Sequence, residues 1–275
     1  MGKSQHWPDL SMKRSKLQIG EWAESGIGKG DTVLIHSDLR RTIRRYKRQG
    51  IDLSPETVLA SFLDAVGPSG TILLPLFNFD FAKGAPFDFH HTPSHMGSLT
   101  EAGRLHPGAV RTGHPIYSFA VIGANAERFR GVNNFSGYGE VSPFAILREL
   151  DGKIAVLDLP DQDSMTFYHH IEEMHKVPYR YCKTFSGQYT DQNGKTEVRA
   201  YGIFVRDLEK GVLTHVNPVG ELLWERGLYI GCRPQEGSGL RAISARKMYD
   251  FVSNIIVSGK AKGLLYVIQG EAENG

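Results

Sequence analysis

Apolar and polar positions along the chain predict strands that are followed by helices. DTVLIHSDL (residues 31–39) and TILLPLF (71–77) are apolar runs of strand length, and SPETVLASFLDAV (54–66) between them has apolar residues at helical intervals. Ser54 suits the N-cap of this helix, and Pro55 suits its first position. A strand, a helix and a strand in this order favour a parallel α/β arrangement.

The same pattern continues along the rest of the chain, which has no internal repeat or low-complexity linker. We expect further helices over 12–28, within 98–106, from Ser142, around 219–225 and over 244–258. We expect further strands in 117–124, 153–159, 200–208 and 240–243, and a hairpin turn at 191–195. The sequence therefore predicts a single α/β domain over residues 1–275. Its sheet should be central and mostly parallel with flanking helices, and a smaller antiparallel β portion should follow in the C-terminal part.

Residues 78–114 form a long segment rich in His, Phe, Pro and Gly. Long irregular stretches inside compact domains tend to be binding loops, so we expect this one to line a cleft. Its histidines are His90, His91, His95, His106 and His114. Their spacing resembles no closed metal site, and Asp88 and Glu101 are the only carboxylates of residues 87–119, so no metal site is predicted.

Charge excludes some partner classes. The chain has 32 Lys and Arg against 30 Asp and Glu, a formal net charge of +2, which does not favour nucleic acid as the main partner. One local excess is RRTIRRYKRQG (40–50), with six basic residues and no acid. It suits an anionic ligand such as a phosphorylated cofactor, or it is a solvated helix or loop face.

The two cysteines, Cys182 and Cys232, support neither a disulfide framework nor a structural zinc site. The sequence has no apolar run of about eighteen residues and no signal-peptide pattern at its start. We therefore expect a cytoplasmic protein that does not act at a membrane.

The segment TFYHHIEEMHKVPYR (166–180) holds the sharpest candidate chemistry. On a helix, His169 and Glu172 share a face because they are three positions apart, and so do His170 and Glu173. No two of its histidines have the i, i+4 spacing of a zinc helix. Acid/base catalysis needs only one histidine oriented by a carboxylate, and the alternative is an ordinary solvent-facing helix. The sequence also lacks GxSxG, Walker A and Rossmann GxGxxG motifs.

Four segments taken together resemble one family. In order they are GDTVLIHSDL with GPSGTILLPLFNF, then TPSHMGSLTEAGRLHPGAVRTGHPIYSFAVIGANA, then YGEVSPFAILREL with GKIAVLDL, and finally TFYHHIEEMHKVPYR. This order, over about residues 30–180, is similar to the aminoglycoside 3-N-acetyltransferase family. The resemblance implies an α/β fold distinct from the common small acetyltransferase fold, and transfer of an acetyl group from acetyl-CoA to an amine.

The resemblance also implies roles for particular residues. The family's T..H..E pattern falls on Thr166, His169 and Glu172, which makes His169 the expected general base. Its supporting carboxylate stays open, because Asp88 in the cleft loop and Glu197 after the hairpin turn are alternatives to Glu172. Residues expected to bind the cofactor's pantetheine and pyrophosphate are His36, Ser37, Arg111, His114 and Ser118.

Three departures from the family pattern bear on the acceptor: Asp38 replaces a serine, Tyr117 replaces a histidine, and the basic run follows His36. Aminoglycosides are polycations, so a basic run favours a small-molecule amino sugar with negative charge, such as a nucleotide-linked or acidic sugar of a surface polysaccharide. The alternatives are an aminoglycoside antibiotic as acceptor, a hydroxyl acceptor, and a basic run that serves only the phosphates of acetyl-CoA. Two alternatives lie outside the acetyltransferase class: a His-rich metal-dependent hydrolase and a non-catalytic binding protein. The chain could also form a homo-oligomer, and the sequence leaves this open.

Overall fold

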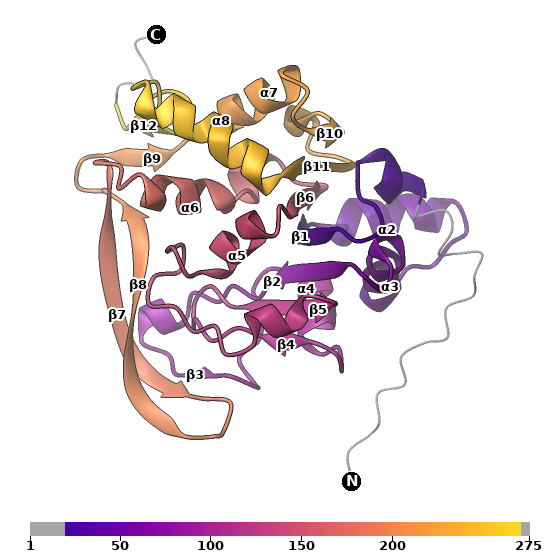
Figure 1. Ribbon diagram of the computed structural model, residues 1–275, viewed down its shortest axis with the longest axis horizontal. Helices are drawn as coiled ribbons and strands as arrows, with labels where there is room; N and C mark the ends of the chain where they lie inside the picture. Colours follow the sequence, from indigo (N-terminus) through magenta and orange to yellow (C-terminus); the bar gives the residue numbers. More distant parts are fainter. Residues whose placement is uncertain (1–19, 271–275) are drawn as a thin grey trace.

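The computed structural model describes residues 20–270, and a seven-stranded mixed sheet forms its centre (Figure 1). In spatial order the strands are β10 (Ile230–Gly231), β11 (Leu240–Ser244), β6 (Lys153–Leu157), β1 (Thr32–Ser37), β2 (Thr71–Pro75), β5 (Phe119–Gly123) and β4 (Val110–Arg111). The three central strands, β6, β1 and β2, run parallel, and every outer strand is antiparallel to its neighbour. The expected α/β fold is confirmed, with its parallel part at the centre of the sheet.

Helices cover both faces of the sheet because successive strand residues point to opposite sides. On β1, Val33 and Ile35 belong to one buried apolar cluster, which includes residues of α2, α3 and α4, whereas Leu34 belongs to a second cluster with α5, α6, α7 and α8. The helices are α2 (Leu39–Arg48), α3 (Pro55–Val66), α4 (Ser98–Arg104), α5 (Pro143–Glu149), α6 (Phe167–Met174), α7 (Asn217–Glu225) and α8 (Ala245–Val257). Figure 1 shows α2 and α3 together on one side and α5 to α8 on the other.

A long β-hairpin stands beside this layered body. Its strands β7 (Arg180–Thr190) and β8 (Thr196–Arg206) pair along their full length, and β3 (Phe87–Asp88) adds a short parallel strand to β7. Figure 1 shows the base of the hairpin beside α6 and its turn far from that helix. A further small sheet pairs β9 (Val212–Thr214) with β12 (Tyr266–Ile268). The predicted antiparallel portion is thus confirmed.

Short 3-10 helices complete the element order: η1 (Phe81–Lys83), η2 (Ala126–Phe129), η3 (Asp161–Asp163) and η4 (Pro234–Glu236). Most predicted elements lie where the pattern placed them, and Ser54 caps α3 by accepting a hydrogen bond from the Thr57 amide at 3.2 Å. Of the helix expected over 12–28, residues 20–24 are helical and residues 12–19 lie outside the described part. Within residues 20–270, no helix is both long and apolar enough to cross a membrane.

Candidate active site

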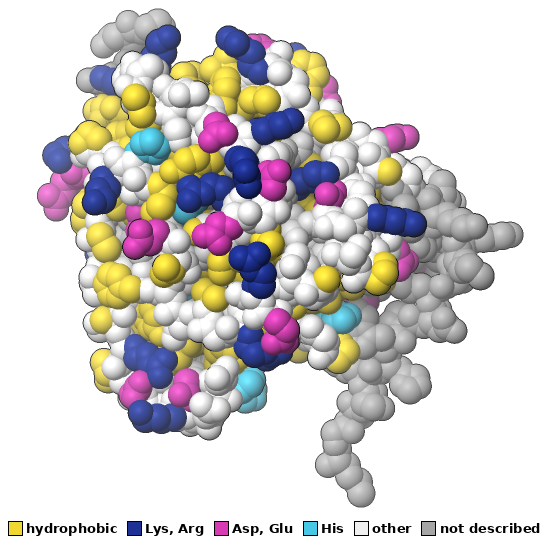
Figure 2. Space-filling model, in the orientation of Figure 1, with side chains coloured by type: hydrophobic (Ala, Val, Ile, Leu, Met, Phe, Trp, Pro, Cys, Tyr) yellow, Lys and Arg dark blue, Asp and Glu magenta, His cyan; other side chains and the backbone are white. Residues whose placement is uncertain are grey.

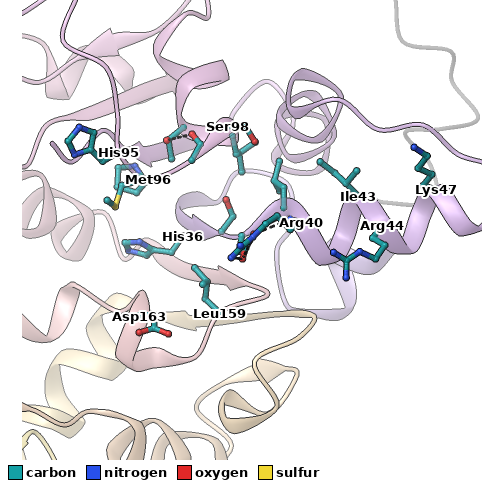
Figure 3. Close-up of a pocket in the computed structure, with 17 residues that line it drawn as sticks. His36, Arg40, Ile43, Arg44, Lys47, His95, Met96, Ser98, Leu159 and Asp163 are labelled. Carbon is teal, nitrogen blue, oxygen red and sulfur yellow. Dashed lines mark hydrogen bonds and ion pairs between the residues drawn. The ribbon is translucent and has the colours of Figure 1, made fainter.

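The carboxyl ends of the parallel strands open into a cavity of about 750 Å³, here called the large cavity. Its wall combines the end of β1, Pro75 at the end of β2, Leu159 after β6, one side of α2 and the start of α4 (Figure 3). Ligands in open α/β sheets bind at this edge of the strands. The fold therefore presents a ligand-sized site at the expected place.

Helix α2 brings a row of positive charge to the large cavity. Arg40, Arg44 and Lys47 line it from successive turns of the helix (Figure 3). The helix is fixed at its start by two carboxylates. Asp38 accepts from the Arg40 amide at 3.0 Å, and buried Asp158 accepts from the amide and hydroxyl of Thr42 at 2.9 and 2.7 Å. The basic run is thus an anchored helix with one face toward a cavity.

His36 lies at the end of β1 with its imidazole buried at the wall of the large cavity. Burial lowers the pKa of His36 to about 4, because a charged ring would lose its hydration there. Its Nε2 has no hydrogen-bond partner among the described residues. A buried polar atom without a partner is costly, and this nitrogen lies beneath the surface of the cavity wall.

His169 on α6 lines two smaller cavities. The middle cavity, of about 260 Å³, and the hairpin cavity, of about 330 Å³, share the side chains of Phe79, Tyr117, His169 and Thr214. The middle cavity also shares Met96 and Asp163 with the large cavity. The three cavities therefore adjoin in series, and His169 stands where the last two meet.

The partner of His169 is Glu172. The distance between His169 Nδ1 and Glu172 Oε2 is 2.9 Å, and Arg180 Nε lies 2.7 Å from the same carboxylate oxygen. Glu172 is fully buried, and the positive charge of Arg180 lowers the pKa of its carboxyl against the opposing effect of burial. The ionised carboxylate accepts hydrogen bonds only, so Nδ1 of His169 carries the proton and Nε2 keeps the lone pair.

Burial, together with the nearby charge of Arg180, lowers the pKa of His169. The hydrogen bond that His169 donates to Glu172 acts in the opposite direction, because it favours the protonated ring. The side chain of His169 keeps 21% of its surface exposed, toward the cavities. A neutral, oriented and accessible imidazole is the arrangement that general-base catalysis requires.

The other two candidate carboxylates lie elsewhere. Asp88, on β3, accepts from the amides of His90 and His91, both at 2.8 Å, and contacts the His91 ring. Glu197, near the hairpin turn, pairs with Lys195 at 2.8 Å and Arg199 at 2.7 Å. Neither lines a cavity that His169 lines. The geometry favours Glu172 over both.

Of the five predicted cofactor ligands, only His36 and Ser37 line the large cavity. His114 and Ser118 have no exposed surface, and His114 Nδ1 accepts from the amides of Ile116 and Tyr117 at 3.2 and 3.0 Å. Arg111 donates to the carbonyls of Phe89 and Thr92 at 2.8 and 2.9 Å. These contacts hold the loop together, so the structure does not support a direct cofactor contact by Arg111, His114 or Ser118.

Sequence reasoning missed a buried charge cluster beside the site. Asp161, in η3, receives hydrogen bonds from Tyr168 and Tyr229 at 2.8 Å each and from Arg241 at 2.6 Å. Asp161 and Arg241 are buried, with fully buried side chains, and Asp161 lines the middle cavity. The cluster fixes η3, whose residues line the middle cavity and, through Asp163, also the large cavity. The only sequence signal was an acidic residue soon after a strand end.

Among the described residues, no group of three or more His, Cys, Asp and Glu side chains is placed to hold a metal ion. The histidines of residues 90–114 are dispersed over separate contacts, such as His90 with the carbonyl of Gln192 and His95 with Asp80.

The profile of the family described as aminoglycoside 3-N-acetyltransferase matches residues 34–256, which is more than half of the chain. The chain belongs to the aminoglycoside 3-N-acetyltransferase family. A relative from Streptomyces paromomycinus, aminoglycoside N(3)-acetyltransferase VII, is 31% identical over 176 residues, covering 56% of this chain and 58% of the relative. Aminoglycoside N(3)-acetyltransferase IX from Micromonospora chalcea is 29% identical, covering 60% and 63%. The chain thus covers less than two thirds of either relative's length.

Solved structures of aminoglycoside acetyltransferases share the fold over most of their length. The crystal structure of aminoglycoside acetyltransferase AAC(3)-Xa superposes with a TM-score of 0.72 at 25% identity, covering 92% of this chain and 93% of that one. AAC-IIIb, solved as a binary complex with CoASH, gives a TM-score of 0.72 at 24% identity, covering 89% and 96%. The predicted family and fold are confirmed.

Proposed function

We propose that this protein is an acetyl-CoA-dependent N-acetyltransferase in which His169 is the general base. The observation that carries the proposal is the pair of His169 and buried Glu172 at the junction of cavities that lead to the large cavity. Family membership supports the reaction type, and one structural neighbour is a complex with CoASH.

The residues of the large cavity fit acetyl-CoA. Arg44 and Lys47 offer positive charge for its phosphates, and His36 offers an unpartnered nitrogen deep in the wall. The shared Met96 and Asp163 mark the passage from this cavity toward His169. Acetyl-CoA would supply the acetyl group as a thioester, with its phosphates at α2 and its reactive end toward the middle cavity.

His169 would then act on an amine bound in the hairpin cavity. Nε2 accepts a proton from the nitrogen as that nitrogen forms its bond to the acetyl carbon and the carbon–sulfur bond breaks. The proton leaves Nε2 for the departing sulfur or for solvent, which restores the neutral ring. Nδ1 keeps its proton throughout and donates a hydrogen bond to Glu172. The carboxylate stabilises the transient positive charge on the imidazole.

The names of the relatives make aminoglycosides the first acceptors to test. Two structural neighbours are complexes with small molecules, AAC-VIa with sisomicin and a mutant of AAC(3)-IVa with apramycin. These comparisons favour an aminoglycoside over the polysaccharide sugar expected from the sequence. Both are amino sugars, so we propose an amino-sugar nitrogen as the acceptor atom. Since acetyl-CoA is made inside cells, the cytoplasm is the proposed compartment.

The test is thiol release from acetyl-CoA by wild type and by His169→Ala, with panels of aminoglycosides and of neutral and acidic amino sugars. The matched control is His175→Ala, because His175 ends the same helix and contacts Ser253 Oγ at 2.8 Å, outside all three cavities. We expect acceptor-dependent release that falls by about 10²-fold or more in His169→Ala and persists in the control. A folded protein that releases no thiol with any acceptor, or a fully active His169→Ala, would contradict the proposal.

A further inference from the structure

The hairpin cavity, where the acceptor would lie, has an unusual charge. Within residues 20–270, its lining contains the three cationic side chains Arg180, Lys183 and Arg206 and no Asp or Glu. Aromatic rings, including those of Tyr181 and Phe185, supply much of the rest. The side chains around the nucleophile's binding site are therefore basic and aromatic.

Two of these three positive charges are not compensated. Arg180 lies against Glu172, so its charge is balanced inside the protein. Lys183 and Arg206 are exposed, and neither forms an ion pair with a carboxylate in the part of the chain that the structure describes. Lys183 Nζ lies 5.5 Å from the centre of the Phe185 ring. The cavity thus presents a net positive surface to whatever it binds.

Nearby acids are engaged elsewhere. Asp207, which follows Arg206, pairs with Lys210 at 2.7 Å, and Glu173 accepts from Ser136 Oγ at 2.8 Å. On the face of the molecule shown in Figure 2, basic and acidic side chains are interspersed. The excess of positive charge described here belongs to the side chains that line the hairpin cavity.

A ligand with several ammonium groups would meet like charges in this cavity, and like-charge contacts disfavour a partner strongly. An acceptor with a carboxylate or phosphate would instead find two unpaired cations. The same cations would lower the pKa of a nearby ammonium group, so that more of the acceptor nitrogen is in its neutral, nucleophilic form.

We propose that the acceptor is an amino sugar that carries an anionic group, and that Lys183 and Arg206 bind this group while the amine faces His169. This inference rests on the proposed acetyl transfer and narrows its acceptor. The rings of Tyr181 and Phe185 would pack against the apolar face of the sugar. Lys183 and Arg206 then determine specificity for the acceptor.

The experiment compares kcat/KM for glucosamine, glucosamine 6-phosphate, an amino sugar with a carboxylate in place of the phosphate, and kanamycin. Each acceptor is tested with wild type, Lys183→Gln, Arg206→Gln and Arg206→Glu. Lys195→Gln is the matched control, because Lys195 is an exposed cation at the far end of the same hairpin. Comparison of glucosamine 6-phosphate with the carboxylate analogue identifies which anionic group the protein prefers.

We expect wild type to prefer the anionic sugars to glucosamine by about tenfold or more, as a hydrogen-bonded charge contact allows. Arg206→Gln should remove most of this preference, because it should raise KM for the anionic sugars more than KM for glucosamine. Arg206→Glu should shift the preference toward kanamycin. Preference of wild type for kanamycin, or equal effects of Arg206→Gln on all acceptors, would overturn the inference while leaving acetyl transfer intact.

Binding gives a second readout that needs no turnover. Calorimetry with the CoA-bound protein should show tighter binding of glucosamine 6-phosphate than of glucosamine, and loss of this difference in Arg206→Gln. Equal binding of the two sugars would overturn the inference even if no acceptor supports thiol release. Failure of acetyl transfer and failure of anion recognition are therefore measured separately.

Discussion

Glu172 Oε2 lies 2.9 Å from His169 Nδ1, one helical turn away on α6, and the side chain of Glu172 is fully buried. The same oxygen lies 2.7 Å from Nε of Arg180, at the start of the long hairpin. Glu172 thus connects the candidate base to a buried guanidinium that also donates to the Phe204 carbonyl at 3.2 Å. One carboxylate therefore contacts both the candidate base and the first residue of the hairpin.

We predict that Glu172→Gln lowers both stability and turnover. Loss of the carboxylate leaves the buried charge of Arg180 uncompensated, which should reduce the free energy of unfolding by about 3–5 kcal/mol. The kcat should fall by about 10²-fold, because the amide no longer fixes the tautomer of His169. Chemical denaturation and thiol release measure the two effects.

A pH profile separates orientation from general damage. Glu172 favours the protonated form of His169, so its removal should lower the pKa of His169 further and move the acid limb of kcat/KM to lower pH. Glu197→Gln is the control, since the ion pairs of Glu197 lie at the surface, where solvent screens them, and contribute little to stability. An unmoved acid limb in Glu172→Gln would argue that Glu172 has only a structural role.

The shared face of His169 and Glu172 could be predicted from sequence because it is local, although the sequence left Asp88 and Glu197 as alternatives to Glu172. Residues three apart on a helix share a face, and the spacing of His and Glu in residues 166–180 suited a helix. The strands and capped helices were predictable for the same reason, since Ser54 and its helix lie within one short segment. Periodicity and capping are properties of neighbouring residues.

The contacts that complete the site join residues far apart in the chain. Arg241 and Asp161 are separated by 80 positions, and Thr42 and Asp158 by 116. No local pattern specifies such pairs. For the same reason, the sequence could place His114 in a candidate loop but could not show that its ring is fully buried among backbone groups.

The basic face of α2 gives a prediction about the cofactor. We expect the double variant Arg44→Gln, Lys47→Gln to raise KM for acetyl-CoA by about tenfold, because hydrogen bonds to phosphate charges are lost. The dependence of this KM on salt should weaken as well, since fewer charges steer the ligand. Steady-state kinetics at two ionic strengths is the measurement.

Arg45→Gln is the matched control for this face. Arg45 lies on the same helix but pairs with Glu21 at 2.8 Å and does not line the large cavity. Its replacement should leave KM for acetyl-CoA unchanged. A double variant that raised KM for the acceptor and not for acetyl-CoA would show instead that α2 binds the acceptor.

The last prediction concerns stability at acid pH. Burial lowers the pKa of each of His36, His114 and His170 to about 4 in the folded protein, against about 6.5 in an unfolded chain. Below pH 6.5 the unfolded state therefore binds protons that the folded state does not. The stability due to these groups is complete above that pH and falls as pH decreases toward 4, by about 2 kcal/mol per residue between pH 7.5 and pH 5.

His170→Asn isolates one of these contributions. His170 Nδ1 lies 2.7 Å from the Tyr138 carbonyl, and the asparagine amide can keep that donor while removing the titrating ring. Urea denaturation at pH 7.5 and pH 5 should show a loss of stability that is about 2 kcal/mol smaller in His170→Asn than in wild type. His91→Asn, at an exposed ring, is the control and should lose as much as wild type. If His170→Asn also loses as much as wild type, protonation of His170 does not contribute to acid unfolding, and the remaining pH dependence belongs to His36, His114 and the carboxylates.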